Sequence, residues 1–167
     1  MPTAIKSNNI PEQSIILKDF GKVNYLDSFH IYKDTEATID SITVNVFKGP
    51  KWVGSLMKVR DSIVGIFGLK TAKKKNSGDK EFYPIGSKID FFTVVDRNDN
   101  EIVMAENDKH LNFRTSVMIE RNGTHTSVHL STIVKFNNIF GRLYFIPVKP
   151  FHRLIIKSIL KKFAETN

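Results

Sequence analysis

The sequence contains no cysteine, which excludes disulfide bonds, thiolate metal ligands and a cysteine nucleophile. The first ten residues lack the apolar stretch of a secretory signal peptide, and no run approaches the ~20 apolar residues that a transmembrane helix needs. Hydrogen-bonding aromatic residues are also few, since one Trp and four Tyr accompany 13 Phe. These absences lead us to expect a cytoplasmic protein.

Acidic residues are outnumbered: 17 Asp and Glu stand against 25 Lys and Arg, and the net charge is +8. The positive charge is concentrated in residues 70–80 and 149–162. Such a charge is typical of proteins that bind nucleic acid, an anionic membrane or an acidic ligand. Aromatic side chains do not alternate with the lysines as they do in a nucleic-acid groove. We therefore expect no nucleic-acid partner, whereas peripheral contact with a membrane surface stays open.

The clearest structural pattern lies between Leu111 and Phe136, where two alternating strands flank Asn122-Gly123. An Asn-Gly pair between such strands predicts a β-hairpin, because both central residues of a type I′ turn have positive φ. With Arg121 opposite Thr124, Phe113 faces Thr132. One face of the hairpin is then apolar and the other carries serines, histidines and charged residues. The pattern predicts a sheet with one buried face and one wet face.

Periodicity and turn residues predict the remaining elements. They are an irregular segment over 1–21, a strand over 22–32, a helix beginning at 34–36 and stopped by Gly49-Pro50, and a helix over 51–67. A second hairpin joins 89–95 to 101–107 with Asp96 opposite Glu101. A last, amphipathic helix has Pro147 and Pro150 near its start, where proline is tolerated, and Phe151 and Leu154 in its apolar stripe. Helices on one side of an antiparallel sheet predict an α+β fold. At 167 residues the chain is expected to form one domain over 22–167.

This order of elements resembles the helix-grip fold of the START-like superfamily, also called SRPBCC. The chain is also similar to an uncharacterised family of bacterial cytoplasmic proteins. That similarity lies in five stretches, namely Pro50–Val53, Leu56–Arg60, Val64–Lys70, Asp108–Arg114 and Gly141–His152. The resemblance implies a curved sheet wrapped around a long C-terminal helix, with a cavity between them. It implies no established activity.

A cavity of that kind is a small-molecule site, mostly apolar with a few polar groups. The alternative is a solid core filled by phenylalanines. The predicted lining is Tyr25, Trp52, Phe91, Met104, Glu106, Phe113, Thr115, Leu130, Thr132, Phe151 and Ile155. Glu106 is the candidate catalytic residue, because a carboxylate on an apolar face has a raised pKa and can act as an acid or base. Arg142, His152 and Arg153 are candidates for holding an anionic head at the start of the last helix.

No metal site or cofactor is expected. His125 and His129 share a strand face, but no third ligand accompanies them, and no glycine-rich dinucleotide fingerprint occurs. Three functions remain. The first is binding of a small hydrophobic or amphipathic molecule between sheet and helix. The alternatives are an enzyme of cyclase or dehydratase type acting on such a molecule, and a basic module that docks on a membrane surface or a partner.

Overall fold

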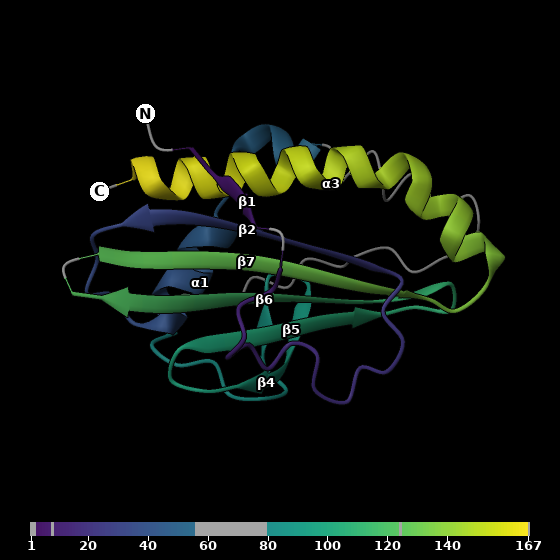
Figure 1. Ribbon diagram of the computed structural model, residues 1–167, viewed down its shortest axis with the longest axis horizontal. Helices are drawn as coiled ribbons and strands as arrows, with labels where there is room; N and C mark the ends of the chain where they lie inside the picture. Colours follow the sequence, from purple (N-terminus) through teal and green to yellow (C-terminus); the bar gives the residue numbers. More distant parts are fainter. Residues whose placement is uncertain (1–2, 8, 56–79, 124, 167) are drawn as a thin grey trace.

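The computed structural model describes residues 3–7, 9–55, 80–123 and 125–166. Seven antiparallel strands form one curved sheet in the order β1-β2-β7-β6-β5-β4-β3. The strands are β1 Ile5–Ser7, β2 Tyr25–Lys33, β3 Lys88–Ile89, β4 Phe92–Arg97, β5 Glu101–Asn107, β6 Leu111–Asn122 and β7 His125–Phe136. The helices are α1 Ile39–Phe47 and α3 Ile139–Glu165. Figure 1 shows α3 running the length of the sheet beside β2. The predicted α+β fold is confirmed.

The β6–β7 hairpin is confirmed, but its predicted register was wrong by two residues. Asn122 pairs with His125, and Phe113 faces Val134 rather than Thr132. Gly123 has a φ of 62° and is the first residue of the turn, a position where glycine is favoured in hairpins. Because side chains alternate with a period of two, a slip of two residues leaves each one on its predicted face.

The helix-facing side of the sheet holds the main core. Side chains of β2, β5, β6 and β7 pack there against α1 and the C-terminal half of α3. A smaller cluster lies at the other end of the sheet, where Tyr25 and Val134 meet Phe145 of α3. The polar residues described below lie between these two apolar clusters.

The opposite face of the sheet is not the wet face that the hairpin pattern predicted. Ile16 and Phe20 of the N-terminal segment pack on Val103 and Ile133 and cover it. Arg114 ties this segment down by donating to the carbonyl oxygen of Ile16 at 3.2 Å. The polar residues of this face are largely buried, among them Ser28, Ser116, Ser127, His129 and Ser131. The alternation placed these side chains correctly, but it could not show that an irregular segment covers them.

Other predicted elements differ in detail. The N-terminal segment predicted to be irregular contains the short strand β1, and β2 begins at Tyr25 rather than at residue 22. A bulge between Val94 and Asp96 puts Val94 opposite Met104 and in the main core, whereas the predicted register had put Val95 on the inward face. The first helix begins at Ile39, because Thr38 caps it by accepting a hydrogen bond from the backbone of Ser41. In the second helix, residues 51–55 are helical and the rest of the predicted stretch lies outside the described residues.

The last helix begins about two turns before the two prolines that were predicted to lie near its start, at Ile139, with Asn138 as its N-cap. Pro147 and Pro150 therefore lie inside the helix. Proline lacks a backbone N–H and its ring crowds the carbonyl four residues earlier, so such a helix bends, and Figure 1 shows α3 bent toward its N-terminal end. The predicted apolar stripe was partly wrong, since Phe151 and Leu154 are exposed while Ile156, Ile159, Leu160 and Phe163 are buried.

Gly141 lies where the start of α3 passes against the turn before β6. A Cβ at this position would overlap the backbone carbonyl oxygen of His110. The His110 imidazole in turn packs edge-on against the ring of Tyr144, with centroids 5.0 Å apart. The first turn of α3 is thus seated directly on the sheet end, and only glycine allows this approach.

We expect Gly141→Ala to destabilise the protein by about 1–3 kcal/mol, the usual cost of overpacking, because the obstructing atom is backbone and cannot rotate away. Gly54→Ala is the matched control, since it lies in a helical segment where a Cβ meets no atom within 4 Å. Urea unfolding followed by circular dichroism measures both. Equal midpoints for the two variants would contradict the close approach.

Candidate functional site

Three polar side chains lie side by side across the helix-facing side of the sheet. Asp27 of β2 pairs with Thr132 of β7, and Thr132 pairs with Thr115 of β6. All three are at most 2 % exposed. We call them the polar row. One neighbouring row contains Phe29, Leu130 and Val117, and the other contains Tyr25, Val134 and Phe113, so the polar row is enclosed by apolar side chains on both sides.

Helix α3 covers the Asp27 end of the polar row with His152 and Arg153. The Tyr25 hydroxyl donates to Oδ2 of Asp27 at 2.5 Å, and Nε2 of His152 lies 3.3 Å from Oδ1 of the same carboxylate. Nε of Arg153 donates to the Tyr25 hydroxyl at 3.2 Å. We call Tyr25, Asp27, His152 and Arg153 the Asp27 cluster. It joins β2 to α3 immediately after the two prolines.

The hydroxyl groups of the polar row differ in their partners. The Thr115 hydroxyl donates to the carbonyl oxygen of Ser131 at 3.0 Å. Oγ1 of Thr132 is buried and has no hydrogen-bond partner within the described part of the chain. An unpaired buried hydroxyl costs about 1–3 kcal/mol. Thr132 therefore offers a donor and an acceptor beside Asp27 that no described residue uses.

Electrostatics keep the Tyr25 phenol protonated. Burial is the largest cause, followed by the hydrogen bond and the negative charge of Asp27, and together they raise the pKa of Tyr25 far above its ordinary value. Tyr25 therefore serves as a hydrogen-bond donor to Asp27. Nε2 is the His152 nitrogen that faces Asp27, so Nδ1 is the nitrogen that this carboxylate does not engage.

Aromatic rings surround the Asp27 cluster. The ring of Phe145 lies 4.7 Å from that of Tyr25, edge to face. The ring of Phe113 lies 6.2 Å from that of His152, again edge to face. The Lys149 ammonium lies 5.3 Å from the centre of the Tyr25 ring. The phenylalanine rings lower the local dielectric and thereby strengthen the polar interactions of the Asp27 cluster.

The structure brings together six of the predicted site residues, namely Tyr25, Phe113, Thr115, Thr132, His152 and Arg153. Met104 and Leu130 are fully buried in the main core, and Phe91 and Ile155 pack at its margin. Trp52, Phe151 and Arg142 are exposed. Arg142 is ten residues before His152, or roughly 15 Å along a helix, so the predicted anion-binding group is not assembled.

Glu106, the predicted catalytic candidate, is half-buried at the end of β5. It pairs with Phe113, in the same row as Tyr25 but three strands away, or roughly 14 Å. It therefore lies outside the Asp27 cluster. The carboxylate of the cluster is Asp27, which sequence analysis missed. Its signal was available, because Asp27 occupies an inward position in the alternating strand between Tyr25 and Phe29.

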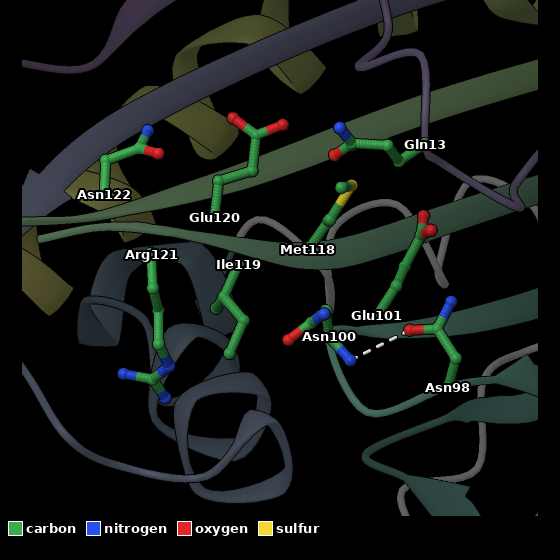
Figure 2. A pocket seen from close by; sticks show the side chains of 9 residues that line it. All are labelled: Gln13, Asn98, Asn100, Glu101, Met118, Ile119, Glu120, Arg121 and Asn122. Atoms are coloured by element: carbon green, nitrogen blue, oxygen red, sulfur yellow. Dashed lines mark hydrogen bonds between the residues drawn. The ribbon is translucent and has the colours of Figure 1, made fainter.

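A separate hollow of about 600 Å³ lies beside the Met118–Asn122 end of β6 and the turn between β4 and β5. Figure 2 shows Glu120 and Gln13 on one side of the strand and the turn with Asn98 and Asn100 near Glu101. The carboxylates have internal partners: Glu101 accepts from the Ser14 hydroxyl at 2.6 Å, and Glu120 lies 3.1 Å from Nε2 of His129. Among the described residues no group of three or more His, Asp or Glu side chains could hold a metal ion.

A family model described as "Protein of unknown function (DUF2867)" matches residues 20–159. No curated protein and no solved structure matches the chain. The matched region contains every strand of the sheet except β1, together with all of the Asp27 cluster.

We expect Tyr25 to be missing from the tyrosinate absorbance of the folded protein at about pH 11, because its raised pKa keeps it protonated there. The difference between the tyrosinate spectra of wild type and Tyr25→Phe should be flat while both proteins are folded. It should show the ionisation of one tyrosine once both are unfolded in guanidinium. Asp27→Asn should move the ionisation of Tyr25 to lower pH.

Since the folded chain holds this proton more tightly, the free energy of unfolding should fall as pH rises above about 10, and Tyr25→Phe should lack this contribution. A full tyrosine signal from folded wild type at pH 11 would contradict the burial of Tyr25.

Proposed function

Since the chain belongs to this family of unknown function, we propose its function from the geometry alone: it binds a small amphipathic molecule between the sheet and α3. The polar head of the molecule is held at the Asp27 cluster and its apolar part lies against the neighbouring aromatic side chains. The observation that supports this proposal best is the buried hydroxyl of Thr132, which has no protein partner in the described chain and lies next to Asp27.

The donors and acceptors of the cluster favour a neutral head group. Asp27 supplies acceptor oxygens, Thr132 supplies both a donor and an acceptor, and the Arg153 Nε already bonds to Tyr25. A hydroxyl or carbonyl group can satisfy this set. A carboxylate or phosphate head would lie against the negative charge of Asp27, which is unfavourable at low dielectric.

The proposal includes a fold of the helix-grip, START-like type, in which α3 is the helix held by the curved sheet. It also includes a cytoplasmic location and a bacterial source. The element order and the packing of α3 on β2 and β7 support the fold assignment.

A second candidate is an enzyme that performs acid–base chemistry on the bound molecule. The pairing of Asp27 with His152 favours it, because a carboxylate beside one imidazole nitrogen orients the ring, and an oriented imidazole is the usual acid–base group of enzymes. In this function His152 takes a proton from the molecule at Nδ1 and Asp27 positions the ring. Tyr25 then donates to Asp27 throughout.

Thr132→Val tests binding. The substitution keeps the shape of the side chain and removes the unpaired hydroxyl, so we expect stability to be unchanged or to rise by about 1 kcal/mol. The dissociation constant for a fluorescent long-chain alcohol should rise about tenfold, which corresponds to ~1.4 kcal/mol. Fluorescence titration and thermal unfolding measure the two effects.

Thr115→Val is the matched control, because its hydroxyl already donates to Ser131 and its loss should cost stability. An unchanged dissociation constant in Thr132→Val, together with higher stability, would contradict a ligand head at the polar row. Failure of wild type to bind the alcohol, with no small molecule seen by native mass spectrometry of freshly purified protein, would overturn the proposal.

His152→Gln separates the binder from the enzyme. The glutamine amide can still donate to Asp27, but it cannot take up a proton. A binder should keep its affinity for the alcohol within about threefold and co-purify with the same molecule as wild type. An enzyme should accumulate a different molecule in the variant, because the reaction stops after binding, and chromatography with mass spectrometry distinguishes even an isomer. The same molecule in both proteins, by mass and by retention, would exclude a catalytic role for His152.

A further inference from the structure

The N-terminal half of α3 presents an apolar surface on the side away from the sheet. Six large side chains there are more than half exposed: Ile139, Phe140, Leu143, Ile146, Phe151 and Leu154. At about 100° per residue they fall within an arc of about 140° on one side of the helix. We call them the α3 ridge. Pro147 and Pro150, also exposed, lie in the same arc.

Exposure on this scale needs an explanation. Monomeric proteins rarely expose contiguous apolar patches larger than a few hundred Å² unless the patch binds a partner or a membrane. The side of α3 that faces the sheet is already occupied by Phe145, Ile156 and Ile159. Packing against the sheet therefore explains the apolar residues on one side of the helix, but it does not explain those of the ridge.

The charges beside the ridge have one sign. Six of the side chains in α3 are basic, namely Arg142, Lys149, Arg153, Lys157, Lys161 and Lys162, and one is acidic, Glu165. By helical position, Arg142, Lys149 and Arg153 follow one flank of the ridge, and Lys157 and Lys161 continue its line beyond Leu154. The acidic residue lies in the last turn, beyond the ridge, where its carboxylate is 3.9 Å from the Lys161 ammonium.

From this arrangement we propose that the α3 ridge docks on an anionic membrane surface, with the helix lying in the plane of the interface. Apolar side chains enter the boundary between headgroups and acyl chains while neighbouring lysines and arginines bind lipid phosphates, which is how interfacial helices attach. Within the described chain no helix is both long and apolar enough to span a bilayer, so the attachment is peripheral.

Charge favours this occupant over a second copy of the chain. Two ridges packed together would bring their basic flanks into contact within a molecule whose net charge is +8. An anionic lipid surface neutralises these flanks and takes up the apolar side chains at the same time. Nucleic acid would neutralise the charges but would leave Phe140 and Leu143 in water.

The test is flotation of the full chain with vesicles of phosphatidylcholine alone or with about 30 % phosphatidylglycerol, at about 0.1 M and about 0.5 M salt. We expect binding to the anionic vesicles, weakened at least tenfold by the higher salt. The double variant Phe140→Ser and Leu143→Ser should lose at least tenfold in binding. Arg142→Gln with Lys161→Gln should weaken it severalfold.

Two double variants are matched controls. Leu17→Ser with Ile85→Ser removes equally exposed apolar side chains elsewhere, and Lys6→Gln with Lys22→Gln removes two exposed charges elsewhere. Both should bind like wild type, and circular dichroism checks that every variant folds. Equal binding to neutral vesicles, an unaffected ridge variant, or no vesicle binding would each overturn the proposal. A dimer in light scattering that the ridge variant dissociates would instead assign the ridge to a second copy.

Discussion

The arrangement of this protein depends on the buried carboxylate of Asp27. A charged group with so little exposure is very costly unless hydrogen bonds compensate for the lost water. Tyr25 of the same strand supplies one such bond. The second polar contact is made by His152, which belongs to α3. The helix is therefore held at a fixed position along the sheet, with residue 152 above Asp27. Apolar packing alone is less directional and would tolerate sliding.

Two stretches far apart in the sequence meet around this position. The turn and strand at 108–114 carry His110 and Phe113, and the first half of α3 carries Gly141, Tyr144 and His152. Gly141 lies against the His110 carbonyl, Tyr144 packs on the His110 ring, and His152 packs on Phe113. Both are among the stretches that suggested a resemblance to an uncharacterised family. In the structure one stretch is the seat of the other.

Local patterns predicted the architecture well. The alternation in the β6–β7 hairpin assigned each side chain to the correct face even with the register two residues wrong, since faces depend only on odd or even position. The position of each side chain along its face was harder to predict. The turn at Gly123 sets the register, and the predicted turn placed glycine second instead of first, which displaced every cross-strand pair, including those of Thr132.

The candidate site was predicted in part for the same reason. Tyr25, Thr115 and Thr132 were chosen because they face the helix, and they do. Asp27 was overlooked although it occupies an inward position of the same alternation, where a charged residue is informative. The cover supplied by Phe20 and the early start of α3 could not be deduced, because each depends on tertiary contacts that override local signals.

The two prolines have a mechanical meaning for the helix that contains them. Neither can donate to the carbonyl four residues before it, so the backbone between Leu143 and Pro150 lacks two of the bonds that stiffen an α-helix. The segments on either side are fastened separately, one at Gly141 and the other by the buried residues from Ile156 onward. Helix α3 thus consists of two anchored segments joined at the prolines, where bending is easiest. A change of angle between the segments would be felt first at His152, the residue just beyond the prolines whose imidazole contacts Asp27 of β2.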